Sequence, residues 1–196
     1  MKRNLIVSAL LIGASLGAFA QTAASTVQRD VKQEQRIEQG LQNGSITTRE
    51  GALLERDEAK VDRLQAKSMK DGKLSANERA ELKAAQNKAS RDIHTATSNG
   101  VNGNPLSASS QRMQADVQRN IDQQKRIEAG VQNGSLTKHE AAKLERGQAK
   151  VDHKEYVAGR DGHVGAKEQK KVQRSENKQS DRIHHEKHDD QTRNKG

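Results

Sequence analysis

The chain has 196 residues, of which 31% are hydrophobic and 1% aromatic, and its 35 Lys and Arg outnumber its 26 Asp and Glu. It contains no cysteine, which excludes disulfides and thiol catalysis. So few apolar residues cannot fill a thick globular core, but they can supply the narrow apolar stripes of a helical bundle.

Residues 1–20 are typical of a bacterial signal peptide. Lys2 and Arg3 precede a short apolar run, and Ala18-Phe19-Ala20 fits the small-x-small cleavage pattern. An uncleaved membrane anchor is the alternative, but the run is short for a bilayer span and polar sequence follows at once. We expect cleavage between Ala20 and Gln21, a periplasmic or secreted mature chain without a transmembrane segment, and no nucleic-acid partner.

The rest of the chain is an internal duplication. Residues 27–94 align without a gap with residues 117–184, at an offset of 90, and 31 of 68 positions are identical. Between the copies lies an uncharged stretch rich in Gly, Ser and Asn that contains the only proline. We therefore divide the chain into signal peptide 1–20, helical repeat 21–95, flexible linker 96–112, helical repeat 113–190 and disordered tail 191–196.

Turn signals divide each copy into three helices. Asn43-Gly44 suits a helix stop, and Thr47-x-x-Glu50 is a capping box that starts the next helix; both recur in the second copy. Asn-Gly also occurs in β-hairpins, but alternating β-branched flanks are missing here. The fold class is all-α, two tandem three-helix repeats, with helices near 24–42, 48–70, 76–95, 113–132, 138–160 and 166–190.

Neither catalysis nor buried charge is expected. The sequence holds no Ser-His-Asp signature, no phosphate loop and almost no aromatic lining for a pocket, so we predict that the protein is not an enzyme. Mixed runs such as Glu55-Arg56-Asp57-Glu58 indicate solvent-exposed helix faces. We therefore expect most carboxylates to be solvated, with ordinary pKa values.

Histidines concentrate at the C-terminal end. In a helix, His184 and His188 share one face and His185 and Asp189 another, which is a spacing that can chelate Zn²⁺, Cu²⁺ or Ni²⁺. The alternative is a solvated, frayed helix end. No cofactor is required, and we expect any such metal to bind weakly through His184, His185, His188 and Asp189.

A calcium site is a further alternative. Asn43-Gly44-x-Ile46-x-x-x-Glu50 resembles the second half of an EF-hand loop, but Gln39 and Leu41 stand where acidic ligands are expected. The turn and its cap account for the same residues. We expect no tight Ca²⁺ binding there.

The helix starts Ile46-Thr47-x-x-Glu50, Leu74-Ser75-x-x-Glu78 and Leu136-Thr137-x-x-Glu140 resemble the L-T-x-x-Q motifs of the Spy/CpxP family, with Glu in place of Gln. That resemblance implies an all-helical periplasmic chaperone of envelope stress. The stretch from Val131 to Arg146 is also similar to exported bacterial helical-repeat proteins without an assigned activity.

These observations lead to a non-enzymatic periplasmic binding protein. We expect an envelope-stress or chaperone-like role, in which a basic helical surface holds unfolded or anionic envelope components through Arg36, Arg56, Lys60 and their counterparts Arg126, Arg146 and Lys150. The alternatives are sequestration of Zn²⁺, Cu²⁺ or Ni²⁺ by the histidines and degenerate EF-hand-like calcium binding.

Overall fold

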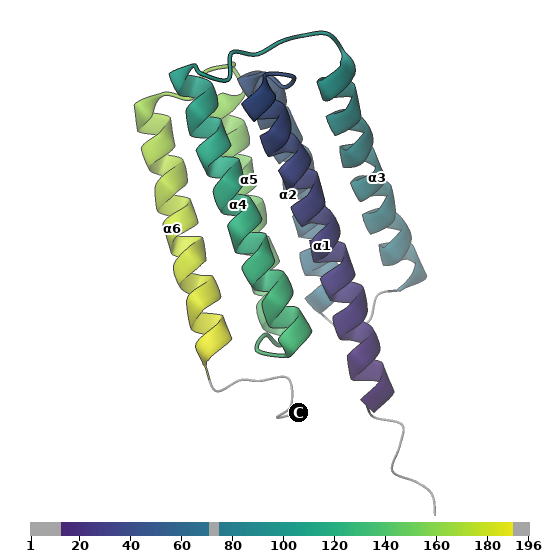
Figure 1. The fold of residues 1–196 in the computed structure, drawn as a ribbon. Coiled ribbons are helices and arrows are strands. Elements are labelled where there is room, and N and C mark those ends of the chain that lie inside the picture. The colour runs from purple at the N-terminus through teal and green to yellow at the C-terminus, as the bar shows by residue number, and fades with distance from the viewer. Residues whose placement is uncertain (1–12, 71–74, 190–196) are drawn as a thin grey trace, which may run out of the picture.

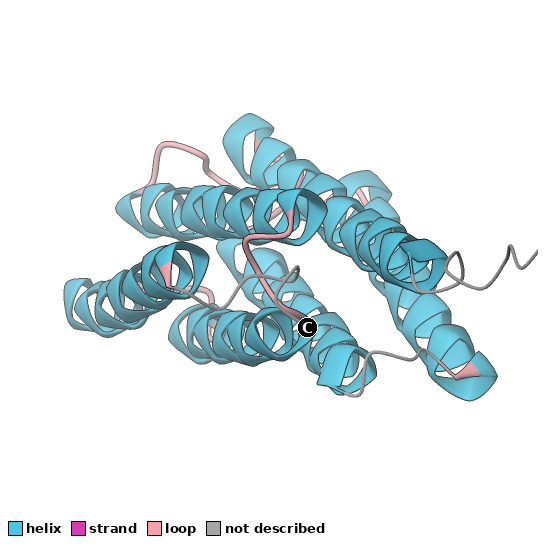
Figure 2. Ribbon diagram, turned by 90° about the horizontal axis from the view of Figure 1, so that it is seen from below, coloured by secondary structure: helices cyan, strands magenta, loops and turns pink. Residues whose placement is uncertain are grey.

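The computed structural model describes residues 13–70 and 75–189, with side chains from residue 23 onward. This part of the chain is all-α and has no strand, which confirms the predicted fold class (Figures 1 and 2). None of its helices has an apolar run long enough to cross a membrane. Its six helices are α1 (Gly13–Asn43), α2 (Thr48–Lys70), α3 (Ala76–Ser98), α4 (Ala108–Asn133), α5 (Lys138–Gly159) and α6 (Ala166–His188).

Two of the predicted segments fall largely outside the described residues. The first twelve residues of the predicted signal peptide are not described, and neither is the tail 191–196. The predicted cleavage point lies within α1, so a mature chain that starts at Gln21 would begin inside this helix.

The predicted helix ends are present where the turns are described. Thr137 accepts a hydrogen bond from the Glu140 backbone N–H while the Glu140 carboxylate accepts one from the Thr137 N–H, and Ser75 and Glu78 form the same capping box. Gly44 and Gly134 take positive φ angles of 80° and 81°, which favour glycine. The Asp71-Gly72 turn lies outside the described residues.

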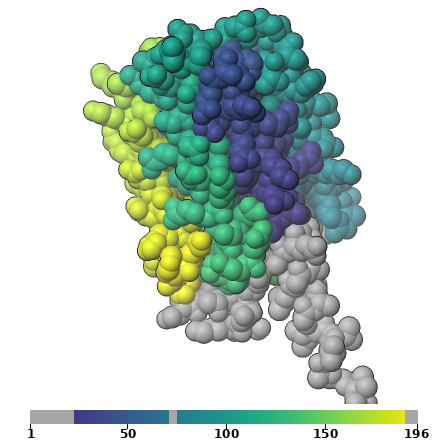
Figure 3. Space-filling view, in the orientation of Figure 1, coloured from purple at the N-terminus to yellow at the C-terminus, as the bar shows by residue number. Residues whose placement is uncertain are grey.

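The two copies do not pack as separate three-helix units. α2 packs chiefly against α5 and α1 against α4, which joins four helices from both copies into one central bundle. α3 and α6 flank this bundle on opposite sides (Figure 1). One apolar cluster accordingly combines Leu41 and Ala52 with Met113, Val117 and Val164. The space-filling view shows α1 and α4 side by side on one face (Figure 3).

Matching polar contacts attach the outer helices to the bundle. Two contacts of the first copy recur 90 residues later between equivalent side chains: Arg29–Asn87 with Arg119–Asn177, and Arg36–Ser90 with Arg126–Ser180. Arg36 and Arg126 therefore brace α1 on α3 and α4 on α6. Their guanidinium groups are thus engaged in contacts within the molecule.

The connection between the copies is a packed loop, not the flexible linker predicted over 96–112. α3 continues to Ser98 and α4 begins at Ala108. The Gly103 N–H donates to the Gly44 carbonyl at 2.8 Å, and the Asn99 side chain donates to Glu50 at 2.6 Å. These bonds hold the loop on the turn between α1 and α2.

Candidate metal centre in the bundle interior

The interior of the bundle is acidic. Eleven carboxylate side chains are buried, whereas no Lys or Arg in the described chain is buried with them. This buried group, which was not expected from the sequence, consists of Asp30, Glu34, Glu55, Glu58, Asp62, Asp116, Glu140, Glu145, Asp152, Glu155 and Glu176.

Their positions follow from helix periodicity and from the pairing of the copies. On α1, Asp30 and Glu34 recur at three- and four-residue spacing in the same stripe as Val27, Val31 and Ile37, all of which are buried. On α2, residues such as Glu55 would face solvent in a single three-helix unit. The second copy covers that face, because α2 lies against α5.

Burial changes the acidity of these groups. Desolvation raises the pKa of Asp30 and of Asp152 to about 7, against hydrogen bonds that lower it. Desolvation and then the neighbouring Asp152 and Glu58 carboxylates raise the pKa of Glu34 well above its usual range. The pKa of Glu55 is also raised well above its usual range, first by burial and then by the neighbouring Glu34 carboxylate. These groups are therefore poised to hold either protons or a cation near neutral pH.

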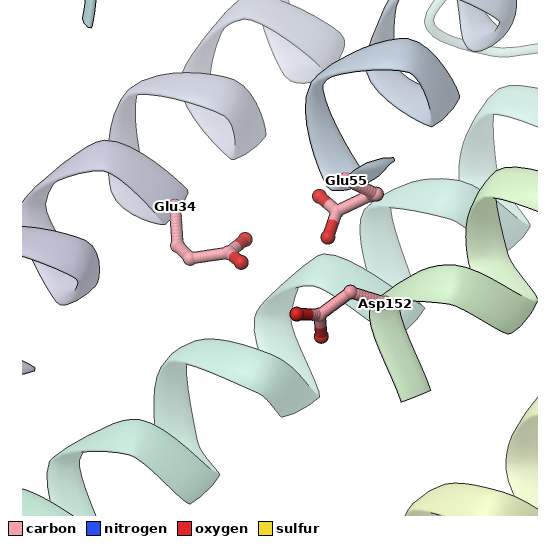
Figure 4. Close-up of side chains that lie close together, drawn as sticks. All are labelled: Glu34, Glu55 and Asp152. Carbon is pink, nitrogen blue, oxygen red and sulfur yellow. The ribbon is translucent and has the colours of Figure 1, made fainter. Parts of the chain in front are cut away.

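Three of the buried acids converge on one point. Glu34 comes from α1, Glu55 from α2 and Asp152 from α5, and one oxygen of each lies within 4.8 Å of the other two. Figure 4 shows the three carboxylates pointing toward one another. We call Glu34, Glu55 and Asp152 the acid triad.

Amide side chains orient two members of the acid triad. Asn120 on α4 donates to Glu55 Oε2 at 3.3 Å, and Gln148 on α5 donates to Asp152 Oδ1 at 3.3 Å. Each triad carboxylate nevertheless keeps one buried oxygen that no amide or backbone N–H reaches: Glu34 Oε2, Glu55 Oε1 and Asp152 Oδ2. Asp152 also has the Asp62 carboxyl as a side-chain hydrogen-bond partner, so a proton can lie between these two acids. An outer shell that fixes ligands while leaving one lone pair on each free is the arrangement that metal sites use.

The predicted histidine site is brought together only in part. The ring centroids of His184 and His188 lie 4.3 Å apart, and His188 Nδ1 is 2.7 Å from the His184 carbonyl oxygen. Asp189 instead groups with Glu140 and Glu186. Among the described residues, no group of three potential ligands includes a histidine.

The EF-hand-like turn is explained by its caps. Glu50 Oε2 accepts from the Thr47 N–H at 2.9 Å, and Glu50 Oε1 accepts from Asn99. Asn43 Oδ1 accepts from the Ser45 N–H at 2.9 Å. The side chains that would serve as calcium ligands are therefore engaged in holding the turn.

The acid triad was missed at the level of sequence, although one signal was present. Asp30 and Glu34 fall in phase with the apolar stripe of α1, where a solvated carboxylate is not expected. Glu55 and Asp152 gave no comparable signal, because their burial depends on the other copy.

No family model, curated protein or solved structure matches this chain.

Proposed function

We propose that the protein binds one hard divalent cation at the acid triad, and that it acts as a non-enzymatic cation-binding protein. The observation that carries this proposal is the convergence of three buried carboxylates, each with an oxygen that no amide or backbone N–H reaches. Like charges so close together, without a buried Lys or Arg beside them in the described chain, require either protons or a cation.

The ligand set indicates which cations suit the site. Carboxylate oxygens without imidazole or thiolate favour hard ions such as Ca²⁺ and Mn²⁺ over Zn²⁺ or Cu²⁺. Mg²⁺ prefers to keep several of its waters and fits a buried protein cage less well. We therefore name Ca²⁺ and Mn²⁺ as the ions of choice, at a place different from both metal sites considered from sequence.

Protons and the cation compete for the same oxygens. Because the pKa of Asp152 is about 7, part of the triad is protonated at neutral pH and must lose protons when metal binds. We expect affinity to rise with pH between about 6 and 8, and calorimetry in buffers of different ionisation enthalpy to show proton release.

The test is metal loading of the mature chain. Protein stripped with a chelator at pH 5 is incubated with Mn²⁺ or Ca²⁺ at pH 7.5, desalted and analysed for metal content. We expect one ion per chain. Glu34→Gln keeps the shape of the side chain but removes one anionic ligand, and should weaken binding by at least about tenfold, since even outer-shell changes cost 10- to 100-fold.

Glu38→Gln is the matched control. Glu38 lies one turn further along α1, is partly exposed and accepts a hydrogen bond from Gln42. This variant should bind metal like the parent. Equal binding by Glu34→Gln and the parent would place any bound ion elsewhere, for example at the histidine end, which His184→Ala and His188→Ala would then reveal.

The cellular setting is part of the proposal. The leader-like residues 1–20 support export to the periplasm, and the absence of catalytic signatures in the sequence supports binding without turnover. A mature N-terminus other than Gln21 in protein recovered from the envelope would contradict the expected cleavage.

A second candidate function is chaperone-like binding of unfolded proteins by a basic surface of this protein. A groove between α5 and α6 favours it, because cationic side chains from three helices line it and no acidic one does among the described residues: Arg63, Lys150, Lys154, Lys178 and Arg182. Such a surface attracts acidic segments of an unfolded protein.

Aggregation assays test this second candidate. A stoichiometric amount of mature protein should suppress aggregation of an unfolding acidic client, and added salt should weaken the effect because the contacts are electrostatic. Replacing Lys150, Lys178 and Arg182 with Gln should reduce suppression, whereas Glu34→Gln should leave it intact. No suppression in low salt at a large molar excess would remove the candidate.

A further inference from the structure

The acid triad has a counterpart in the other half of the bundle. Because the copies align at an offset of 90, the positions equivalent to Glu34, Glu55 and Asp152 are Gln124, Glu145 and Asp62. All three are buried. The second half therefore repeats the triad with one change, an amide in place of the carboxylate on the first helix of the copy.

The geometry confirms that the two sets are equivalent. Glu34 reaches across the copies to Asp152, and Gln124 reaches across in the opposite sense to Asp62. Reciprocal contacts of this kind define an internal two-fold relation. Asp62 and Asp152 occupy equivalent positions and form a side-chain hydrogen bond with each other, so the two sets meet at this pair.

Gln124 supplies what the acid triad lacks. Its Nε2 donates to Asp62 Oδ1 at 3.1 Å and makes a long contact of 3.5 Å with Glu145 Oε2. The neutral Gln124 amide thus bridges the two carboxylates as a hydrogen-bond donor. The equivalent position in the acid triad, Glu34, adds a third carboxylate instead. Gln124 Nε2 occupies the role that a cation would take in the acid triad.

The same exchange occurs at two further buried positions. Asp30 and Glu58 in the first copy correspond to Asn120 and Gln148 in the second. Asn120 accepts from Gln148 at 2.9 Å, whereas the equivalent Asp30 and Glu58 repel each other, and Asp30 is the neighbour that most raises the pKa of Glu58. Three acids on α1 and α2 thus correspond to three amides on α4 and α5. At two other buried positions the exchange runs the other way, because Gln65 and Gln86 correspond to Glu155 and Glu176.

We infer that the second half of the bundle holds a latent cation site that the Gln124 amide blocks. Of the two equivalent sites, one can then bind a cation and the other cannot. This rests on the proposed function. The identity of the residue at position 34 or 124, acid or amide, decides which half binds the ion. Gln124 is therefore the determinant of stoichiometry, although it belongs to no ligand set in the parent chain.

Exchange of the two residues tests the inference. Metal content per chain is measured for the full mature protein with Mn²⁺ at pH 7.5. We expect one ion for the parent, two for Gln124→Glu and much less than one for Glu34→Gln, whose affinity is reduced. The double variant Glu34→Gln with Gln124→Glu keeps the number of buried acids constant and should bind one ion in the second half.

A further substitution locates that ion. Added to the double variant, Glu145→Gln should abolish binding, whereas added to the parent it should leave one ion bound. Circular dichroism at pH 5, where the acids are protonated, checks that every variant is folded. If Gln124→Glu fails to fold, the double variant still decides the question.

The outcomes separate the two proposals. One ion in the parent but still one in Gln124→Glu, or none in the double variant, overturns the latent site and leaves the proposed function standing. No ion in the parent or in any variant overturns both. Binding in the double variant that survives Glu145→Gln also overturns the inference, because the ion would then lie outside the second half.

Discussion

At the scale of single residues, an acid in the core makes the stability of this protein depend on pH in an unusual direction. Asp30 and Asp152 have folded pKa values of about 7 against an ordinary value of 3.8. Between these values the folded chain keeps protons that the unfolded chain releases. Their contribution to stability is therefore complete below pH 4 and is lost as pH rises through 7.

Thermal unfolding in the presence of a chelator measures this effect. We expect Tm to fall by roughly 10 °C or more between pH 5 and pH 8, because each kcal/mol corresponds to about 2–4 °C for a chain of this size. Mn²⁺ or Ca²⁺ should restore most of the loss at pH 8, since a bound cation replaces the protons. A Tm that stays constant or rises over this range would show that the acids are hydrated and not buried.

At the level of helices and turns, the turn after α1 and the turn after α4 each pack closely on the preceding helix. This close approach leaves room only for glycine at one position of each helix. The Ile46 N–H donates to the Gly40 carbonyl at 2.9 Å, and the Leu136 N–H repeats this bond to Gly130 at 3.0 Å. These bonds fold the apolar residue after each turn back onto the helix. A Cβ at Gly40 would lie 2.4 Å from Ile46 Cδ1, and a Cβ at Gly130 would lie 2.6 Å from Leu136 Cδ1.

The sign of a Gly→Ala substitution tests this packing. In an open helix, Ala is favoured over Gly by about 1 kcal/mol. At Gly40 and Gly130 the methyl group must displace a buried side chain, so we expect Gly→Ala to destabilise the protein by about 1–3 kcal/mol. Gln39→Ala, on the exposed side of α1, should be close to neutral in the same denaturant titration. Stabilisation at both glycines would contradict the turn geometry.

At the scale of the whole molecule, the close packing lies between the copies. A Cβ at Gly159 of α5 would lie 2.9 Å from Ala52 Cβ of α2 and 2.5 Å from Met113 Cε of α4. Small residues thus allow α2 and α5 to approach closely. A copy taken alone would expose this interface together with acids such as Glu55.

Fragments 21–98 and 112–196 show whether each copy can stand alone. We expect each to be weakly helical and to melt without cooperativity, because α1 and α2 lose the partners that cover them. Mixing the two in equal amounts should restore helicity and a cooperative melt. A 21–98 fragment with native helicity and a sharp transition by itself would show instead that the first copy folds without the second.

Local structure could be predicted from short stretches of the amino-acid sequence. Helix stops at Asn-Gly, capping boxes at Thr137 and Ser75, and the apolar stripe of α1 all depend on neighbouring residues, so they could be read without knowing the partner of each helix. The internal duplication could also be recognised from the sequence alone. These features fixed the fold class and the bounds of most helices to within a few residues.

The pairing of the two copies, and the site that this pairing creates, depend on contacts between helices that are distant in the chain. Glu55 stands in a run of mixed charges that is typical of a solvent face, and α2 would expose it in a single copy. Placing α5 and α4 over that face buries Glu55 beside Asp152 and Asn120. Burial of a charged side chain is set by contacts between helices far apart in the chain, and no local pattern records which faces of two copies will meet.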